Sequence, residues 1–409
     1  MEQAILVGCQ MQTESDNTFN SSLEELQALA ETVDAEVVEV FTQKRERPHQ
    51  SFYIGTGKVK EIKHYIEENE IDVVIINSEL TPTQNRNLTN IWEVKIVDRT
   101  QLILDIFAMR ARTKEGKLQV ELAQLEYMLP RLHGKGIELS RLGGGIGTRG
   151  PGETKLETDR RHIRNRISDI KSALKQVVKH RDQYRENRKR NSVFQISIVG
   201  YTNAGKSTLF NRLTNESSLE ENRLFATLDP LTRKISLPCG FQALISDTVG
   251  FIQKLPTSLI AAFRSTLEEV TVADFILHVV DCSHENAIEH EKTVNDILKE
   301  LNADHIPRLT VYNKSDLLDD EFIPYSKPSI VMSTFNQDDL KRLKMKIQEV
   351  LTEEWQKYEL TIPSEESHII HRLKQQSIVE NEHFHEIENS YHVLGYIDPE
   401  TPLYNQIIK

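Results

Sequence analysis

Short apolar runs alternate with stretches of helical periodicity over the first hundred residues. The apolar runs occupy residues 4–9, 36–41, 73–76 and 94–97. Between two of these runs, Leu23, Leu26 and Leu29 recur at the spacing of one helical face. Strands that are apolar throughout indicate a parallel sheet covered by helices. We therefore expect an N-terminal parallel-sheet α/β domain at residues 1–108, with the polar segment 42–53 as a loop.

The pattern changes over residues 109–191. Four leucines between positions 118 and 129 share one face of a helix, which Pro130 ends or nearly ends. A second stripe, from Ile163 to Val177, has the alternating four- and three-residue spacing of a heptad pattern. The Gly- and Arg-rich stretch 131–155 lies between the two. We expect an antiparallel helical hairpin that carries this stretch as a long loop.

Strands and helices alternate again from residue 192. The strand candidates are 194–199, 243–245, 275–280, 309–311 and 330–332, and the helical patterns fill 205–213, 257–270, 286–301 and 338–354. This alternation predicts a second α/β domain at residues 192–355. The final segment, 356–409, is polar and rich in histidine without strong periodicity, so we expect only a small C-terminal region there. The predicted fold class is α/β.

Charge is distributed unevenly along the chain. Overall, 50 Lys and Arg against 62 Asp and Glu give a formal charge of −12, which by itself argues against nucleic-acid binding. The segment 109–190, however, holds 21 basic and 10 acidic residues, and 8 of the 17 glycines lie between Gly134 and Gly152. The basic charge is therefore concentrated in the predicted helical hairpin.

Composition also excludes several classes of protein. A hydrophobic content of 38% is enough for packed cores, so wholesale disorder is not expected. The apolar runs are too short to cross a bilayer, and Glu2 stands where a signal peptide would carry positive charge. The three cysteines are far apart and form no disulfide or zinc spacing. We expect a cytoplasmic protein without a membrane partner.

Residues 200–207 read GYTNAGKS and match the pattern GxxxxGK[ST]. They follow an apolar strand candidate and open a helix, which is the context of a phosphate-binding loop. Backbone N–H groups of such a loop converge on phosphate oxygens, while Lys206 reaches the β- and γ-phosphates and the Ser207 hydroxyl binds Mg²⁺. The predicted nucleotide contacts here are Gly200, Tyr201, Thr202, Asn203, Ala204, Gly205, Lys206, Ser207 and Thr208. By contrast, Gly55–Lys58 lacks this spacing and is expected to be a turn that leads into a helix.

Two further motifs follow later strand candidates. Asp247 begins the sequence DTVG, in which the carboxylate can hold Mg²⁺ and the N–H of Gly250 can bond the γ-phosphate. The sequence NKSD comprises Asn313, Lys314 and, two residues later, Asp316. The Asp316 carboxylate can accept hydrogen bonds from guanine N1 and N2, a donor pair that adenine lacks. The three motifs in this order predict GTP as the substrate.

Together these motifs resemble those of the translation-factor-related P-loop GTPases. More narrowly, residues from about 1 to 355 resemble the HflX family of ribosome-associated GTPases. The sequences that carry this resemblance are RLGGGIGTRGPGETKLETDRR at 141–161, GYTNAGKSTLFN at 200–211, FATLDP at 225–230, DTVGFI at 247–252 and IGTGKV at 54–59. The resemblance implies a Mg²⁺-dependent GTPase that acts on ribosomes.

The resemblance also implies roles for particular residues. Thr227, in the segment that corresponds to the first switch of these GTPases, would bind Mg²⁺ with Ser207 and Asp247, and Thr232 is a less favoured alternative. Thr227 would also act in catalysis, with Lys206 and Gly250. Ser333 and Thr334 would present their backbone to guanine O6, although the family usually has Ser-Ala and a small residue where this chain continues to Phe335.

Phe251 stands where many GTPases carry a glutamine that orients the attacking water. A phenyl ring cannot orient water by hydrogen bonding. We therefore expect slow intrinsic turnover and a partner that completes the site. The family resemblance implies that this partner is the large ribosomal subunit.

The basic hairpin is expected to bind structured RNA. Its loop glycines allow a close approach of the backbone, and its cations neutralise phosphates. The candidate RNA contacts are Arg131, Lys135, Arg141, Gly143, Gly144, Gly145, Arg149, Lys155, Arg160, Arg161 and Arg164. The resemblance implies that the loop reaches toward the peptidyl-transferase centre of ribosomal RNA, and we expect a monomer in solution.

The leading functional hypothesis is a GTPase that docks on the large subunit and splits stalled or idle ribosomes, with GTP hydrolysis releasing it. Two alternatives stay open from the sequence. One is a ribosome-protection variant of the same family that displaces antibiotics from the peptidyl-transferase centre. The other is an RNA-remodelling NTPase, which NKSD disfavours. The paired histidines His368/His371 and His383/His385 are expected to be ordinary surface residues.

Overall fold

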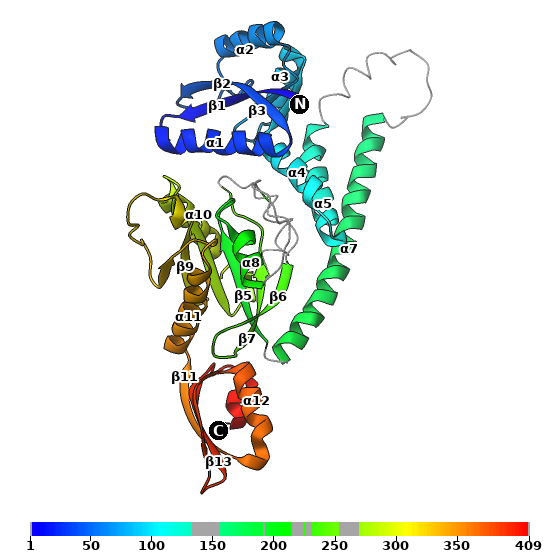
Figure 1. The fold of residues 1–409 in the computed structure, drawn as a ribbon. Helices are drawn as coiled ribbons and strands as arrows, with labels where there is room; N and C mark the ends of the chain where they lie inside the picture. The colour runs from blue at the N-terminus through cyan, green and yellow to red at the C-terminus, as the bar shows by residue number, and fades with distance from the viewer. Residues whose placement is uncertain are drawn as a thin grey trace. The chain divides into compact units, whose positions relative to one another are not determined.

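The computed structural model describes residues 2–132, 155–190, 193–214, 225, 231–252 and 270–407, without the side chains of 155–156, 178–190 and 407. The chain divides into two compact units (Figure 1). The first comprises residues 1–177 with 223–225 and 253–263, and the second comprises the rest. Within the described residues, no helix combines the length and the apolar character needed to cross a membrane.

The first unit contains a four-stranded sheet in the order β2-β1-β3-β4. Its strands are β1 (Glu2–Met11), β2 (Ala35–Arg45), β3 (Val73–Ile76) and β4 (Lys95–Asp98). All neighbouring pairs are parallel, which confirms the predicted sheet type. The prediction of a loop at 42–53 is wrong for its first four residues, because β2 pairs with β1 as far as Arg45. Their polar side chains fit an edge strand that is partly exposed to water.

Three helices connect these strands, and a fourth follows the last strand. They are α1 (Asp16–Thr32), α2 (Thr56–Asn69), α3 (Pro82–Trp92) and α4 (Arg99–Arg110). Side-chain caps mark several starts, since Ser15 accepts a hydrogen bond from the N–H of Thr18, and Thr81 forms a capping box with Gln84. Gly55 is the N-cap of α2, so the prediction of a turn into a helix at this point is confirmed.

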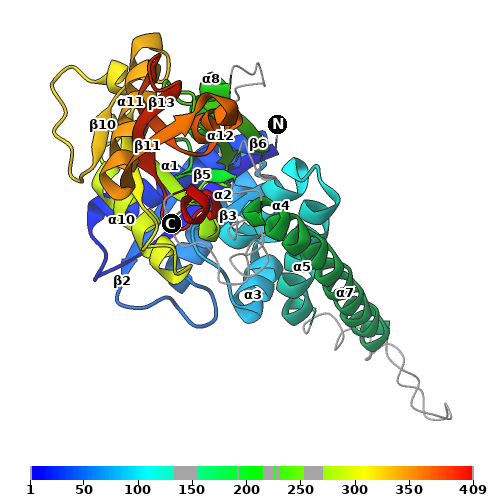
Figure 2. The same ribbon diagram turned by 90° about the horizontal axis from the view of Figure 1, so that it is seen from below.

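Two long helices follow, α5 (Lys114–Arg131) and α7 (Lys155–Arg190). The first ends one residue after Pro130, as predicted. The helices lie side by side in both ribbon views (Figures 1 and 2). Ion pairs join them, from Arg166 to Glu121 at 2.6 Å and from Lys171 to Glu126 at 2.8 Å. Most of the predicted loop, residues 133–154, lies outside the described residues.

The second unit contains a six-stranded sheet in the order β10-β9-β8-β5-β7-β6. The strands are β5 (Phe194–Gly200), β6 (Leu231–Ser236), β7 (Gln242–Asp247), β8 (Phe275–Asp281), β9 (Arg308–Asn313) and β10 (Ser329–Val331). Only β6 is antiparallel to its neighbour among these pairs, and it is the strand that the apolar pattern does not predict. The helices are α8 (Lys206–Thr214), α10 (Ala287–Glu300) and α11 (Gln337–Glu354). Nearly all of the predicted helix 257–270 lies outside the described residues.

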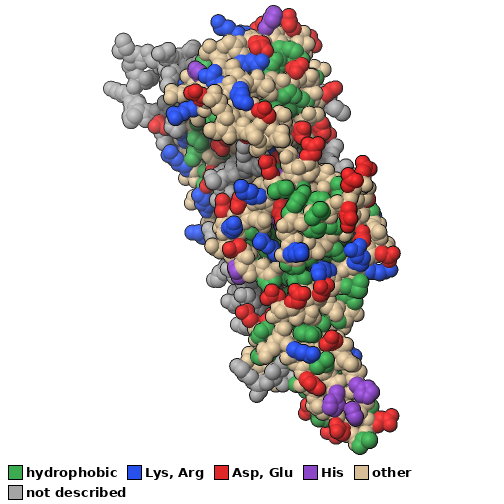
Figure 3. Space-filling view, turned by 90° about the vertical axis from the view of Figure 1, so that its left-hand side faces the viewer, with side chains coloured by type: hydrophobic (Ala, Val, Ile, Leu, Met, Phe, Trp, Pro, Cys, Tyr) green, Lys and Arg blue, Asp and Glu red, His purple; other side chains and the backbone are tan. Residues whose placement is uncertain are grey.

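The C-terminal segment forms a small folded region. Strands β11 (Gln356–Pro363), β12 (Ile378–His385) and β13 (Ser390–Ile397) form an antiparallel sheet in the order β11-β13-β12, accompanied by α12 (Ser367–Gln376) and α13 (Pro402–Ile407). Most of β12 is exposed, so its sequence lacks the apolar alternation that would reveal a strand. His383, His385 and His392 lie together on this sheet, and Figure 3 shows histidine side chains gathered at one end of the face in view. In the described parts of the chain, no group of His, Cys, Asp and Glu is arranged to hold a metal ion.

Candidate functional site

The loop between β5 and α8 has the geometry of a phosphate-binding loop. β5 ends at Gly200 and α8 begins at Lys206, so the motif spans a strand-to-helix turn. A Cβ on Gly200 would lie 2.2 Å from the carbonyl oxygen of Val279. Gly205 has a φ of +91°, and a Cβ there would lie 2.3 Å from Nδ2 of Asn313. Only glycine fits these two positions.

Lys206 is buried inside this loop. Its Nζ donates a hydrogen bond to the carbonyl of Tyr201 at 2.7 Å, and the residue as a whole is only 6% exposed. Burial lowers the pKa of the ammonium group to about 8, although the nearby Asp247 carboxylate opposes this effect. A Cβ built on Gly250 would lie 3.0 Å from Nζ of Lys206. Two of the three residues predicted to act in catalysis are therefore brought together.

Two of the three predicted Mg²⁺ ligands also meet. The hydroxyl of Ser207, on α8, lies 2.7 Å from Oδ2 of Asp247, at the end of β7, and donates to it. Asp247 is only 1% exposed. Hydroxyl and carboxylate oxygens are hard ligands that suit Mg²⁺, which is typically held by few protein groups together with phosphates and water. The third predicted ligand, Thr227, lies outside the described residues.

Asn313 connects the phosphate loop to the predicted guanine-binding segments. Its Nδ2 donates to the carbonyl of Ala204 at 3.0 Å. Its Oδ1 accepts from the backbone N–H of Thr334 at 3.0 Å and from the Thr334 hydroxyl at 2.6 Å. Asn313 is 2% exposed. One buried amide thus joins three separate parts of the predicted nucleotide site.

A hollow of about 350 Å³ lies beside Asp316, and Ser333 and Phe335 also line it. Phe335 is 62% exposed, and the guanidinium of Arg212 lies 5.6 Å from the centre of its ring. Lys314 forms an ion pair with Asp281 at 2.7 Å. Sequence reasoning misses Asp281 and Arg212, because only the fold brings Asp281 to Lys314 and Arg212 to the ring of Phe335.

Phe251 is held behind the phosphate loop. Its N–H donates to the carbonyl of Gly200 at 3.1 Å, and its carbonyl accepts from the N–H of Thr202 at 2.8 Å. Its side chain is 2% exposed, so it packs as a core residue. A buried phenyl ring in this position offers no hydrogen-bonding group to an attacking water, which agrees with the expected need for a partner.

A stacked pair of rings supports the same loop from α10. The rings of Tyr201 and His290 lie 3.8 Å apart and are almost parallel, with His284 at 4.5 Å from His290. Burial, and then the charge of His284, lowers the pKa of His290 to about 4, so this imidazole is neutral near pH 7. Sequence reasoning does not identify His290, because the contact joins α10 to the loop 89 positions earlier in the chain.

Arg131 is placed differently from its predicted role as an RNA contact. Its Nη1 donates to the carbonyl of Tyr127 at 2.8 Å, and its Nη2 donates to the carbonyl of Leu80 at 2.7 Å and lies 3.3 Å from Asp98. The guanidinium also stacks 3.4 Å from the centre of the Tyr127 ring, and the side chain is only 15% exposed. These interactions favour a structural role for Arg131, and its role as an RNA contact stays a prediction.

The other predicted RNA contacts are only partly described. On α7, Arg161 and Arg164 are exposed and Arg160 is half-buried. Lys155 begins α7, but its side chain is outside the described set. The remaining candidates lie outside the described residues: Lys135, Arg141, Gly143, Gly144, Gly145 and Arg149.

Family models match successive parts of the chain. One described as "GTP-binding GTPase N-terminal" matches residues 20–108, and one described as "GTP-binding GTPase Middle Region" matches residues 110–188. A third, described as "50S ribosome-binding GTPase", matches residues 195–314. The three matches follow one another along the chain and include the phosphate loop and Asn313.

Individual known proteins are also similar over most of the chain. A GTPase HflX of Alkalihalophilus pseudofirmus is 54% identical over 408 residues, which cover 100% of this chain and 96% of the relative. A GTPase HflX of Caldanaerobacter subterraneus is 51% identical and covers 94% of this chain and 89% of its own length. The crystal structure of a GTP-binding protein from the archaeon Sulfolobus solfataricus in complex with GDP shares 26% identity, with a TM-score of 0.46 over 86% of this chain and 98% of that chain.

Proposed function

Because the chain belongs to the HflX family of GTPases, we propose that it docks on the large ribosomal subunit when GTP is bound and splits stalled or idle ribosomes. GTP hydrolysis to GDP and phosphate then releases it. The observation that carries the proposal is that the nucleotide motifs meet at Asn313, which forms hydrogen bonds with both Ala204 and Thr334. The part of the chain that contains these motifs matches a family described as a ribosome-binding GTPase.

The phosphate loop and its neighbours provide the binding chemistry. Lys206 approaches the β- and γ-phosphates, whose charge favours the protonated form of its buried amine. Ser207, Asp247 and Thr227 would hold Mg²⁺, which neutralises phosphate charge when bound. Asp316 accepts hydrogen bonds from guanine N1 and N2, and this preference for guanine disfavours an ATP-driven RNA-remodelling role.

Hydrolysis in this proposal depends on the ribosome. Gly250 lies beside Lys206, and in this proposal its N–H bonds the γ-phosphate. Phe251 is buried behind the loop and cannot orient water. A group contributed or repositioned on the large subunit supplies that function, and GTP is therefore retained until docking has occurred.

Attachment to the subunit depends on the basic stretch 131–155 and the exposed arginines of α7. Their positive charge suits ribosomal RNA, which is recognised largely through backbone and shape. In this proposal the stretch reaches toward the peptidyl-transferase centre, as the resemblance to the family implies. Because Arg131 is engaged inside the first unit, Arg141 and Arg149 are the better candidates for phosphate contacts.

The test uses purified full-length protein and intact ribosomes on sucrose gradients. A non-hydrolysable GTP analogue should convert ribosomes into subunits and leave the protein with the large subunit, whereas GDP should do neither. Arg141→Glu combined with Arg149→Glu should abolish co-sedimentation without changing the affinity for fluorescent GDP. Lys60→Glu combined with Lys117→Glu changes the net charge equally at exposed positions outside the stretch and should have no effect. The proposal is contradicted if the double arginine variant still co-sediments with ribosomes, or if ribosomes stay intact in the presence of the GTP analogue.

A further inference from the structure

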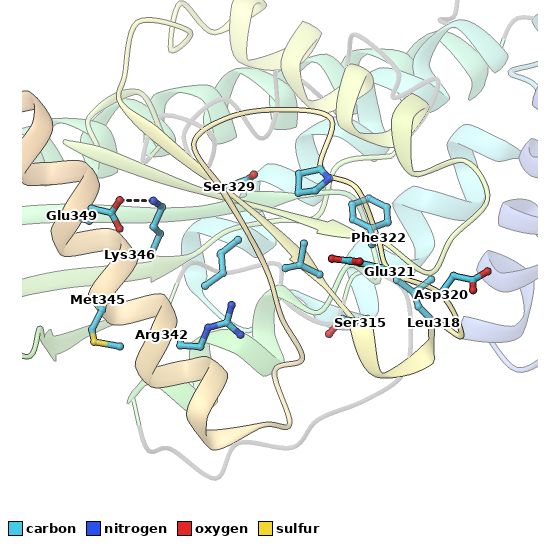
Figure 4. A pocket seen from close by; sticks show the side chains of 13 residues that line it. Ser315, Leu318, Asp320, Glu321, Phe322, Ser329, Arg342, Met345, Lys346 and Glu349 are labelled. Atoms are coloured by element: carbon cyan, nitrogen blue, oxygen red, sulfur yellow. Dashed lines mark hydrogen bonds and ion pairs between the residues drawn. The ribbon is translucent and has the colours of Figure 1, made fainter.

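The connection between β9 and β10 lacks the helix that usually covers such a crossover. Parallel neighbouring strands are commonly joined through an α-helix, as β8 and β9 are joined through α10. Between β9 and β10 there is only a three-residue 3₁₀ turn, Ser315–Leu317. A hollow of about 710 Å³ lies beside this connection, between residues 318–324 and α11 (Figure 4).

Apolar side chains line this hollow and surround it. Phe322 and Val331 lie on its walls, and Met345 of α11 lines it while remaining 54% exposed. Nearby on the same connection, Ile323 is 79% exposed and Tyr325 is 53% exposed. Exposed apolar side chains that gather around a concave surface are typical of a binding site for another molecule.

The hollow also contains an unpaired strand edge. β10 is the last strand of its sheet, and among the described residues no strand pairs with its outer side. The N–H of Thr310 bonds the carbonyl of Pro328, and the N–H of Met332 bonds the carbonyl of Tyr312. Because strand residues alternate, the backbone groups of Ser329 and Val331 point away from β9. An open edge of this kind can pair with an added strand.

The charges around the hollow favour a basic partner. Its two basic side chains already have acidic neighbours on α11, since Arg342 pairs with Asp339 at 2.8 Å and Lys346 pairs with Glu349 at 2.7 Å. On the other wall, Asp320 and Glu321 have no ion pair among the described residues (Figure 4). The uncompensated charge is therefore negative, which repels nucleic acid and attracts lysine and arginine.

We propose that this hollow docks an extended protein segment rich in lysine or arginine. The segment pairs with the outer edge of β10 through its backbone and places an apolar side chain beside Met345. Its basic side chains lie along Asp320 and Glu321. We expect the segment to come from a ribosomal protein, because proteins that bind ribosomal RNA must carry basic charge. Only this assignment of the source rests on the proposed function.

The test measures fluorescence anisotropy of two labelled decapeptides with the full-length, GDP-bound protein. One peptide alternates lysine with valine and the other alternates glutamate with valine. The lysine peptide should bind saturably, and the glutamate peptide should not bind at the same concentrations. Glu321→Lys and Met345→Glu should each weaken binding of the lysine peptide by about tenfold. Fluorescent GDP should bind all variants equally, because neither residue lines the hollow beside Asp316.

Two matched variants serve as controls. Asp304→Lys reverses an exposed charge elsewhere in the second unit, and Ile288→Glu replaces an apolar side chain that is 58% exposed on α10. The proposal is overturned if the lysine peptide does not bind, or if the lysine and glutamate peptides bind equally well. It is also overturned if the Glu321 and Met345 variants bind the lysine peptide with the same affinity as the two controls. Displacement of the peptide by single-stranded RNA, or a dimer that Met345→Glu dissociates, would also overturn it by identifying a different occupant. Ribosomes are absent from this measurement, so its outcome is independent of attachment to the large subunit.

Discussion

The ammonium group of Lys314 lies 2.7 Å from Oδ2 of Asp281, and this ion pair joins the ends of two neighbouring strands. Asp281 ends β8, and its Oδ1 accepts hydrogen bonds from the N–H and the hydroxyl of Ser283. Lys314 has a φ of +66°, a conformation that few non-glycine residues adopt. Asp281 therefore holds the lysine of the guanine motif in place from outside that motif.

Replacing this carboxylate should weaken nucleotide binding. Asp281→Asn keeps the shape but removes the charge, so Lys314 loses its partner and becomes mobile. Affinity for fluorescent GDP should fall by about fivefold to thirtyfold, which corresponds to roughly 1–2 kcal/mol for an ion pair that is only partly buried. Glu285→Gln, at an exposed position in the same turn, is the control and should bind normally. Equal affinities of the two variants would show that the ion pair does not support the site.

Phe335 should form an aromatic wall for the guanine base. It is 62% exposed and lines the hollow beside Asp316, and the Arg212 guanidinium lies over its ring at 5.6 Å from the ring centre. Phe335→Ala should weaken binding of GDP and GTP by the same factor, about fivefold to 150-fold, because stacking on a base contributes roughly 1–3 kcal/mol. Phe335→Tyr keeps the ring and should restore binding. Turnover at saturating GTP should stay unchanged, and a reduced maximal rate without a change in affinity would contradict this role.

Local spacing is sufficient to predict much of the nucleotide site. The phosphate loop depends on a fixed sequence between a strand and a helix, and the structure places Lys206 and Ser207 at that junction. The magnesium and guanine motifs follow buried parallel strands, whose carboxyl ends meet at one edge of the sheet. Asp247 and Asn313 can therefore be predicted from sequence order alone, and the structure brings both to the phosphate loop.

Other features depend on contacts between distant residues and cannot be predicted this way. Arg131 has the sequence context of an RNA contact, yet its guanidinium turns toward Asp98 and Leu80, which lie in other elements. His290 supports Tyr201 only because α10 packs beside the loop. β12 lacks an apolar stripe because most of it is exposed, so its existence follows from pairing with β13 rather than from its own pattern.

The buried ammonium of Lys206 should make stability depend on pH. Its folded-state pKa of about 8 lies below the ordinary value of 10.5, so the unfolded chain binds the proton more tightly. Below pH 8 the amine is charged in both states, and burying it costs roughly 3 kcal/mol. Between pH 8 and 10.5 the folded state loses the proton first, so stability rises with pH, and above that range the cost is absent.

The comparison that isolates this effect is with Lys206→Met. Without nucleotide, the methionine variant should have the higher unfolding temperature at pH 7, and the difference should shrink as the pH rises toward 10. The difference between the two proteins carries the test, because other titrating groups contribute equally to both. A difference in unfolding temperature that stays constant from pH 7 to pH 10 would falsify the expectation.

Arg131 should contribute to stability rather than to ribosome attachment. Asp98 is fully buried, and burial raises the pKa of its carboxyl group even though Arg131 and two backbone N–H groups favour the charged form. Arg131→Ala removes the cation and the ring stacking on Tyr127, so the first unit should lose roughly 2–4 kcal/mol of stability. Arg164→Ala, at an exposed position on α7, should instead leave the unfolding temperature unchanged and weaken binding to large subunits in a salt-dependent way. Co-sedimentation at a temperature where both variants are folded separates the effect on stability from the effect on ribosome attachment. A larger loss of binding from Arg131→Ala than from Arg164→Ala would support Arg131 as an RNA contact.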